Sequence, residues 1–368
     1  MKKLFYFLAI PVLLSAVLFN GCKQKTTPQG NKNQNVQLAE TLEILPTMDS
    51  VSHAKNQVWV GTFQLVWNDM INELLKTPVE FENYKSITAE NLNKQVFTSD
   101  GLSANAYYKK WGEAVPALKA EMEQAIKEKF NETSEVLDQV QWDSTPQDPK
   151  YVLYAMLKKD FEFLEKFAKL DDGKFKGSEE DVKYFGIKDD SFFGLRQSLD
   201  VLFYDNPKNF AVALKTKQND IVYIYRNNDN KTLDVLYKDM LSKAAKYKGN
   251  KNFTGYDKFK VPVIDYKGDT EFSEFYGKAI KGTDFTIDKA IETIEFKMDE
   301  TGVKLKSEAL IHGKTLGIYH RETLPTRYFN ADGPFVIFIE ESAKKPYFAM
   351  KVTDAAKLQK QIKQTAVL

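Results

Sequence analysis

Apolar residues recur at helical spacing in three stretches of the first half of the chain. The first runs from Thr62 to Leu75, the second from Ala104 to Phe130, and a shorter third from Asp160 to Leu170. In each stretch the apolar positions return every three or four residues, which places them on one face of a helix. We therefore predict a helix over each of these stretches.

The second half of the chain shows the alternation and the turn residues that are typical of strands. Phe210–Leu214 and Ile221–Tyr225 flank the polar stretch Lys215–Asp220, which predicts a hairpin. The other predicted strands are Phe259–Tyr266, Thr293–Met298, Val303–Ile311 and Pro334–Glu340. Pro262 cannot donate a ladder hydrogen bond, so we expect it on an edge strand or at a bulge.

Helices come first and strands later, without the alternation of a βαβ fold. The sequence therefore predicts an α+β fold, with helices mainly in the N-terminal half and antiparallel or mixed sheets in the C-terminal half. Neither a repeat nor a Pro/Gly-rich break interrupts the chain after position 35. We expect residues 36–368 to form a single domain, which is large but acceptable for its class.

The N-terminus has the layout of an export signal. Lys2 and Lys3 precede an apolar run from Leu4 to Phe19, which is too short for a comfortable membrane span. Cys22 follows directly after Gly21, a position that resembles the lipobox of bacterial lipoproteins. The resemblance implies a signal peptide over residues 1–21, a lipid on Cys22, and attachment to the membrane of the cell envelope on its extracytoplasmic side. An ordinary signal peptide with an incidental cysteine is the alternative.

The mature chain begins with a polar tether and carries almost no net charge. Residues 22–35 lack apolar periodicity and are rich in Gln, Lys, Asn and Thr, as flexible linkers are. Removing the two signal lysines from 52 basic side chains leaves 50, against 51 acidic ones. Such a balance gives no basic field for nucleic acid. Because Cys22 is the single cysteine, an internal disulfide is excluded.

The search for catalytic chemistry is negative. His53, His312 and His320 do not have metal-ligand spacing, and no Gly-rich phosphate loop or nucleophile-elbow motif is present. Ser342 and Lys345 form an S-x-x-K pair without its companion motifs, so we interpret them as a polar turn between two strands. We predict that the protein is not an enzyme, holds no metal or cofactor, and acts as a monomer.

The C-terminal part resembles the serpin family. Phe329–Ile339, with the sequence FNADGPFVIFI, is similar to the serpin stretch after the reactive loop, and Pro346–Val352 is similar to the final serpin strand. Upstream, Ile287 to Gly302 resembles the strand and hinge before that loop, and Phe259–Pro262 resembles an earlier strand. These pieces occur in the family's order over roughly the last half of the domain. Taken alone, each could be an ordinary buried strand or hairpin turn.

In serpins the exposed loop is a bait for a protease and inserts into a sheet as a new strand after cleavage. The resemblance places the hinge at Gly302, Val303, Lys304 and Leu305. Family inhibitors use small residues there, whereas Leu305 is bulky, so we expect slow insertion and inefficient inhibition. Alternatively, the segment is fixed in the sheet as a hairpin with Thr293–Met298.

If the loop is exposed, it extends from about Ala309 to Thr326, and family spacing puts the bait bond at Leu316–Gly317. Three functions stay open. The first is a lipid-anchored serpin-like protein that is not an efficient inhibitor. The second is a true protease inhibitor at the cell envelope, whose partner is a protease. The third is an unrelated lipoprotein that binds a ligand or assists envelope assembly.

Overall fold

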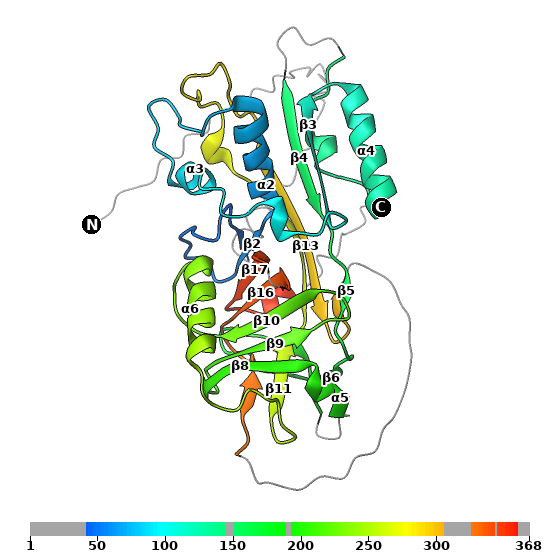
Figure 1. Cartoon of the computed structure of the whole chain (residues 1–368), viewed down its shortest axis with the longest axis vertical. Helices are drawn as coiled ribbons and strands as arrows, with labels where there is room; N and C mark the ends of the chain where they lie inside the picture. The colour runs from blue at the N-terminus through cyan, green and yellow to red at the C-terminus, as the bar shows by residue number, and fades with distance from the viewer. Residues whose placement is uncertain (1–41, 145–149, 189–192, 305–324, 343, 360–368) are drawn as a thin grey trace, which may run out of the picture.

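The computed structural model describes residues 42–144, 150–188, 193–304, 325–342 and 344–359 (Figure 1). Helices and mixed sheets occur together in this part of the chain, which confirms the predicted α+β class. Helices α2, α3 and α4 lie toward one end of the molecule, and the largest sheet lies toward the other (Figure 1). The expected signal peptide over residues 1–21 and the expected tether over residues 22–35 fall outside the described residues.

The largest sheet has seven strands and is buried on both faces along its centre. The predicted hairpin is confirmed, because β9 and β10 pair antiparallel around a polar turn. β16, which contains Phe335–Ile339, and β17, which spans Pro346–Val352, are buried at every position. In spatial order the strands are β1 (Glu43–Ile44), β2 (Gln57–Val60), β17 (Pro346–Val352), β16 (Phe335–Glu341), β10 (Asp220–Arg226), β9 (Asn209–Lys215) and β8 (Leu199–Asn206).

A four-stranded sheet packs against the first through aromatic side chains. The ring of Phe329 lies 4.9 Å from that of Tyr204 and 5.3 Å from that of Phe210, centroid to centroid. Edge-to-face contacts of this kind add to the energy of burial. Its strands, in spatial order, are β15 (Tyr328–Asn330), β11 (Lys258–Pro262), β7 (Val182–Gly186) and β6 (Ala168–Gly173).

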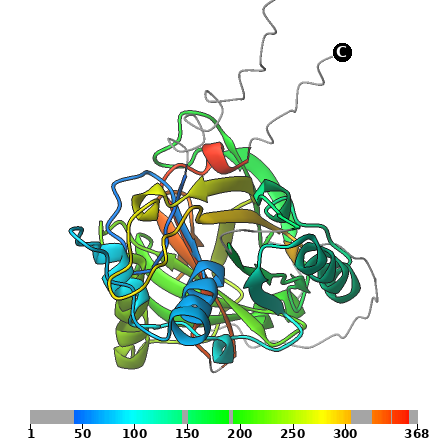
Figure 2. The ribbon, with the colours of Figure 1, turned by 90° about the horizontal axis from the view of Figure 1, so that it is seen from above.

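Two smaller sheets lie side by side near α2 and α4 (Figures 1 and 2). One has the order β12 (Ile264–Glu271), β13 (Ile291–Asp299), β14 (Gly302–Lys304) and β5 (Phe161–Glu162). The other pairs β3 (Tyr107–Glu113) with β4 (Tyr151–Leu157). β4 leads along the chain into β5, so one wall of strands continues from one sheet to the other.

The helices bury one face each. α2 (Thr62–Asp69) continues as the π-helix η1 (Met70–Leu75), and together they confirm the helix predicted over Thr62–Leu75. The other α-helices are α3 (Ile87–Leu92), α4 (Pro116–Phe130), α5 (Phe193–Gln197) and α6 (Leu233–Lys246). Short 3-10 turns are η2 (Ser99–Gly101), η3 (Leu137–Gln139), η4 (Ser273–Phe275) and η5 (Ala356–Leu358). In the described residues no helix is long and apolar enough to cross a membrane.

Two of the helix predictions are wrong in part or in full. The stretch Ala104–Phe130 forms a helix only from Pro116, because proline fits the first helical turn and forces extended backbone before it. The stretch Asp160–Leu170 forms strand pairs instead. Phe161 and Phe163 are both buried, at the two-residue period of a strand, whereas Leu164 is 41% exposed. Tertiary packing of the aromatic rings therefore overrides the apparent helical spacing.

The strand predicted over Phe259–Tyr266 is two strands in different sheets, β11 and β12, which meet at Val263. Pro262 does not lie on an edge strand, because β11 runs between β15 and β7. It is the last residue of β11 and pairs with Tyr184, beyond the point where the pairing with β15 stops at Lys260. The nitrogen of Pro262 therefore points toward the β15 side beyond the end of that pairing, where no ladder hydrogen bond is needed.

Candidate strand-accepting cleft

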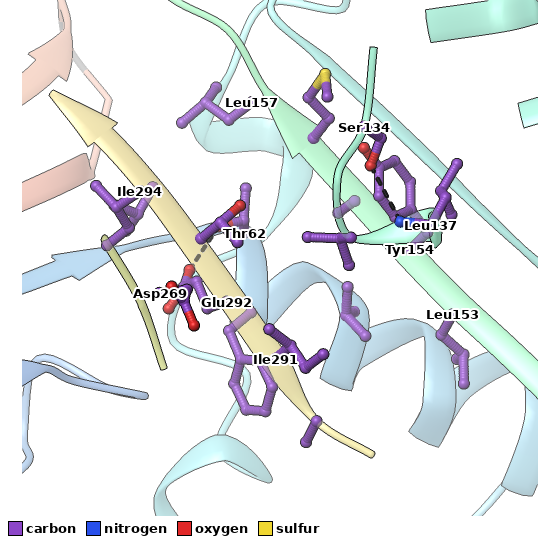
Figure 3. Close-up of a pocket in the computed structure, with 18 of the residues that line it drawn as sticks. Thr62, Ser134, Leu137, Leu153, Tyr154, Leu157, Asp269, Ile291, Glu292 and Ile294 are labelled. Carbon is purple, nitrogen blue, oxygen red and sulfur yellow. Dashed lines mark hydrogen bonds between the residues drawn. The ribbon is translucent and has the colours of Figure 1, made fainter. Parts of the chain in front are cut away.

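A cavity of about 970 Å³ lies between β4 and β13. α2 lies along it, and residues 132–137 and 139–141 also line it (Figure 3). Apolar side chains make up much of the lining, with a few polar groups among them. The apolar lining includes Phe63, Val66, Trp67, Leu137, Leu153, Leu157, Ile291, Ile294 and Phe296.

Both strands present an unpaired backbone edge to this cavity. Within the described residues β4 pairs only with β3, and β13 pairs with β14 only over Lys297–Asp299. The stretch Ile291–Phe296 therefore has hydrogen-bonded neighbours on the β12 side alone. Unpaired strand edges are templates for a further strand, and here two of them line one cleft.

The side chains of β4 divide between two separate hydrophobic clusters. Leu153, Ala155 and Leu157 pack against the main core, whereas Tyr154 belongs to a small cluster built on α4. This alternation is the ordinary consequence of a strand whose successive side chains point to opposite faces. The α4 cluster and the main core thus lie on opposite sides of the plane in which a further strand would run.

At one end the cleft is closed by β14, which pairs on both sides. Val303 is opposite Met298 on β13 and opposite Phe161 on β5, and Lys304 is opposite Lys297. Glu300 and Thr301 form the turn between β13 and β14, and the side chain of Asp299 accepts the N–H of Thr301 at 2.9 Å. β14 therefore enters the position of a central strand between β13 and the wall that continues from β4.

Gly302 permits the close approach of β5. A Cβ atom at this position would lie 2.3 Å from the carbonyl oxygen of Phe161. Backbone atoms cannot yield as the end of a flexible side chain can, so a larger residue would push the two strands apart. The glycine of the expected hinge is thus required by local packing.

Glu292 on β13 is a buried acidic residue in the lining of the cleft. Its side chain is buried, in the inward-facing row with Ile294, Phe296 and Met298. The hydroxyl of Thr62 donates to Oε1 at 2.6 Å (Figure 3), whereas Oε2 has no hydrogen-bond partner among the described residues. Burial disfavours the charged form and raises the pKa of Glu292 to about 8, although the hydrogen bonds from Thr62 and the Phe63 backbone oppose the shift.

An ion network ties the chain after β4 to the largest sheet. Lys159 Nζ lies 2.9 Å from Asp220 Oδ1 on β10 and 2.5 Å from Glu341 Oε1 on β16. Glu341 also accepts the backbone N–H and the hydroxyl of Ser103, at 2.8 and 2.7 Å. Burial would raise the pKa of Glu341, but these donors and Lys344 outweigh it and lower the pKa to about 2. The network fixes the position of this wall of the cleft.

The chain that follows the undescribed residues 305–324 is anchored by a second buried ion pair. Arg327 donates from Nε to Asp257 Oδ1 at 3.0 Å and from a terminal nitrogen to Oδ2 at 2.7 Å. Its terminal nitrogens also donate to the carbonyls of Asn250 and Asn252, each at 2.6 Å. Such a forked contact fixes the direction of the chain as well as its position.

Some of the site residues predicted from the sequence lie in the described part of the chain, and others do not. Gly302, Val303 and Lys304 form β14, paired with β13 as a hairpin. Leu305, the bond Leu316–Gly317 and the lipidation site Cys22 lie outside the described residues, so their roles stay predictions. Ser342 directly follows β16 and donates its N–H to the Asn219 carbonyl, in a turn before β17 as expected.

Clustered metal ligands are absent from the described part of the chain. No group of three or more histidine, cysteine or acidic side chains in the described ranges could hold a metal ion. His53 is exposed, and His312 and His320 fall outside those ranges.

The sequence reasoning did not single out Glu292, Thr62 or Lys159. Glu292 could have been found, because it occupies an inward position of a strand whose other inward residues are apolar. Lys159 carried no comparable signal. Its partners Asp220 and Glu341 are 61 and 182 positions away along the chain, and only the fold brings them together.

Comparisons with known proteins give matches of structure alone. No family model matches the chain, and no curated protein matches it. Serpin48, described as a highly specific serpin in the insect Tenebrio molitor, is 14% identical over 87% of this chain and 98% of its own, with a TM-score of 0.43. Human thyroxine-binding globulin complexed with thyroxine is 10% identical over 79% of this chain and 95% of its own, with a TM-score of 0.44.

A further thyroxine-binding globulin complex is 13% identical, with a TM-score of 0.40, and the match spans 65% of this chain and 65% of that one. All three TM-scores are below 0.5, so these likenesses carry no argument about the function of this chain.

Proposed function

We propose that this chain is a lipid-anchored protein of the cell envelope with a serpin-like domain, whose cleft receives a segment of the same chain as a strand. The observation that carries the proposal is the position of β14, which is paired on both sides at the end of a cleft with two unpaired edges. We further propose that the domain is not an efficient protease inhibitor.

Continuing the register of β14 identifies the segment that would fill the cleft. The pairing with β13 is antiparallel, so each residue further along the segment would face a residue one position earlier on β13. Ser307 would then face Ile294, and Ala309 would face Glu292. On the other side the same steps from the pair Val303 and Phe161 would bring residues 307–313 alongside β4. The segment that follows β14 is thus long enough to complete the sheet.

The alternation of side chains agrees with this register. Val303 on β14 is buried. In a continued strand the side chains of Leu305, Ser307 and Ala309 would point to the same side as that of Val303. The inward neighbours Leu153, Ala155 and Leu157 already pack against the main core on that side. Small side chains at 307 and 309 would suit the space above α2, where Thr62 and Glu292 meet.

Leu305 is the reason to expect inefficient inhibition. In the family that the sequence resembles, inhibition requires the loop to insert before the protease completes its reaction. A bulky leucine at the hinge slows insertion relative to the small residues of family inhibitors. The pairing of β14 with both neighbours also supports a hinge that is held in the sheet rather than free to move.

Limited proteolysis tests the strand-accepting cleft. The mature chain from residue 22, with Cys22→Ser to omit the lipid, is cleaved within residues 309–326 and its melting temperature is compared with that of the intact chain. We expect a large rise if the segment inserts after cleavage. An unchanged or lower melting temperature would contradict insertion on cleavage and indicate a segment that is already fixed in place.

Two variants separate insertion from other effects of cleavage. Ala309→Arg places a long charged side chain on the inward face and should abolish the rise in melting temperature. Glu308→Arg makes a similar change on the outward face and should leave the rise in place. A denaturant-resistant complex with a trypsin-like or chymotrypsin-like protease would instead establish the alternative, an active inhibitor at the cell envelope.

Lipid anchoring is tested separately with the full chain. Leu18-Phe19-Asn20-Gly21-Cys22 resembles a lipobox, which motivates the proposal. We expect the wild-type protein in the membrane fraction and Cys22→Ser in the soluble extracytoplasmic fraction or as an uncleaved precursor. Equal distribution of both proteins would overturn the anchoring.

A further inference from the structure

The cleft between β4 and β13 also has the properties of a small-molecule site. Its volume of about 970 Å³ is near the upper end of ordinary ligand pockets, roughly 300 to 1,000 Å³. Such pockets combine an apolar lining with a few polar groups that orient the ligand. Here the buried polar group is Glu292, with Thr62 beside it (Figure 3).

Glu292 lacks a partner that an ordinary core residue would have. Its Oε2 atom has no hydrogen bond, and its side chain forms no ion pair within the described ranges, although the residue is only 4% exposed. A buried carboxyl group without a partner is unfavourable unless a donor satisfies it. The residue lines the cavity, so a rotation of its carboxyl group would let a bound molecule supply that donor.

The charges at the rim of the cavity favour a cation over an anion. Asp269, Asp284 and Asp288 line it, are exposed, and form no ion pair in the described structure. The rim lysines are mostly neutralised. Lys150 forms no ion pair in the described structure. The other lining lysines do: Lys158 pairs with Glu132, Lys159 with Asp220 and Glu341, Lys267 with Glu135, and Lys289 with Glu271.

We propose that this cleft binds an apolar cation, a molecule with an alkyl or aryl body and a primary ammonium group, whose ammonium donates to Glu292. The body of the ligand lies against Phe63, Trp67 and Leu153, and the carboxyl group of Glu292, whose Oε2 atom is buried in the empty cleft, turns toward the ammonium. This site goes beyond the proposed function and requires a cleft that the segment after β14 has not filled.

Calorimetry with n-octylamine and n-octanol tests the proposal on the mature Cys22→Ser chain. The two probes share an alkyl body and differ in the cationic group. We expect saturable binding of octylamine with one molecule per chain, and binding at least about 30-fold weaker for octanol, the factor expected for a buried charged contact. Octylamine that binds no better than octanol would overturn the proposal.

The number of protons released on binding is a second measurement of whether the amine binds at Glu292. Because Glu292 is expected to be mostly neutral at pH 7 and ionised beside an ammonium group, binding should release about one proton. Titrations in buffers of different ionisation enthalpy measure this number. Binding without proton release would show that the amine sits elsewhere.

Three variants locate the site. Glu292→Gln should weaken octylamine binding by about 30-fold or more and abolish proton release. Glu295→Gln removes a carboxylate at the rim of the same cavity, on the outward face of the strand and 71% exposed, and should change neither by more than a few-fold. Leu153→Trp fills the cavity and should block binding with Glu292 intact, which keeps the test decisive if Glu292→Gln fails to fold. Unchanged binding in both Glu292→Gln and Leu153→Trp would overturn the site.

The outcomes separate this site from the proposed function. Octylamine binding is measured on the uncleaved chain, and insertion is measured as the melting temperature after cleavage. Specific binding without a rise in melting temperature would support the ligand site and contradict the insertion. A rise without specific binding would do the reverse.

Discussion

The hydroxyl of Thr62 on α2 donates a hydrogen bond of 2.6 Å to Oε1 of Glu292 on β13, two residues that are 230 positions apart in the chain. This contact joins the helix beneath the cleft to the strand that forms one of its walls. It satisfies one carboxyl oxygen and leaves the other buried without a hydrogen-bond partner in the described structure. The state of this buried part of the cleft therefore depends on the protonation of Glu292.

The stability of the fold should fall as the pH rises through the range in which Glu292 stays protonated only in the folded state. Its pKa is raised to about 8 in the folded protein from an ordinary 4.5. Below about 4.5 both states are protonated and stability is complete. Between these values the unfolded chain has lost the proton, so the free energy of unfolding falls by up to about 1.4 kcal/mol per pH unit.

Urea unfolding at intervals from pH 5 to pH 9 measures this slope. Glu292→Gln cannot ionise, so its free energy of unfolding should fall less over the same range. Glu295→Gln is the matched control and should follow the wild type. Parallel curves for wild type and Glu292→Gln would contradict the raised pKa.

Replacement of Gly302 by alanine should loosen the closed end of the cleft. The added Cβ would meet the Phe161 carbonyl at 2.3 Å, and forced contacts of this kind destabilise by about 1 to 3 kcal/mol. Gly255→Ala is the control, because no heavy atom lies within 4 Å of its Cβ position. The control should shift stability by no more than about 0.5 kcal/mol. Equal melting temperatures for the two variants would show that β5 and β14 are not packed as described.

Replacement of Lys159 by methionine should be among the most damaging single changes. It leaves the carboxylates of Asp220 and Glu341 buried near each other without their shared cation, and breaking a buried pair costs about 3 to 5 kcal/mol. Lys158→Met removes the neighbouring lysine, whose partner Glu132 has a side chain that is 45% exposed. That control should cost about 1 kcal/mol or less.

Acid titration of the Lys159→Met variant identifies the cause of its loss. The lowered pKa of Glu341, about 2, contributes stability that is present above its ordinary value of 4.5 and is lost as the pH falls toward 2. With Lys159 removed, this contribution should disappear at a higher pH than in the wild type. An unchanged acid midpoint would show that Ser103 and Lys344 hold the carboxylate without Lys159.

Local patterns predicted those elements in which one period was unambiguous. The β9–β10 hairpin, β13 and β16 were found because apolar residues alternate or run continuously between turn residues, whereas β17 was expected from the resemblance of Pro346–Val352 to a serpin strand. The helix prediction for Asp160–Leu170 was wrong because the spacing of Phe161, Phe163 and Phe167 fits both a helix and a strand. Their burial was decided by rings elsewhere, such as Phe185, whose centroid lies 6.0 Å from that of Phe163.

The sequence by itself determined the α+β class, the hairpins, and the glycine at the turn into β14. These depend on side-chain period and backbone conformation over a few residues, which a single sequence contains. The tertiary structure alone decided that β4 and β13 face each other with unpaired edges, and that Thr62 meets Glu292 between them. Strand order and buried pairs join residues hundreds of positions apart, and no local pattern encodes which distant edges come to lie together.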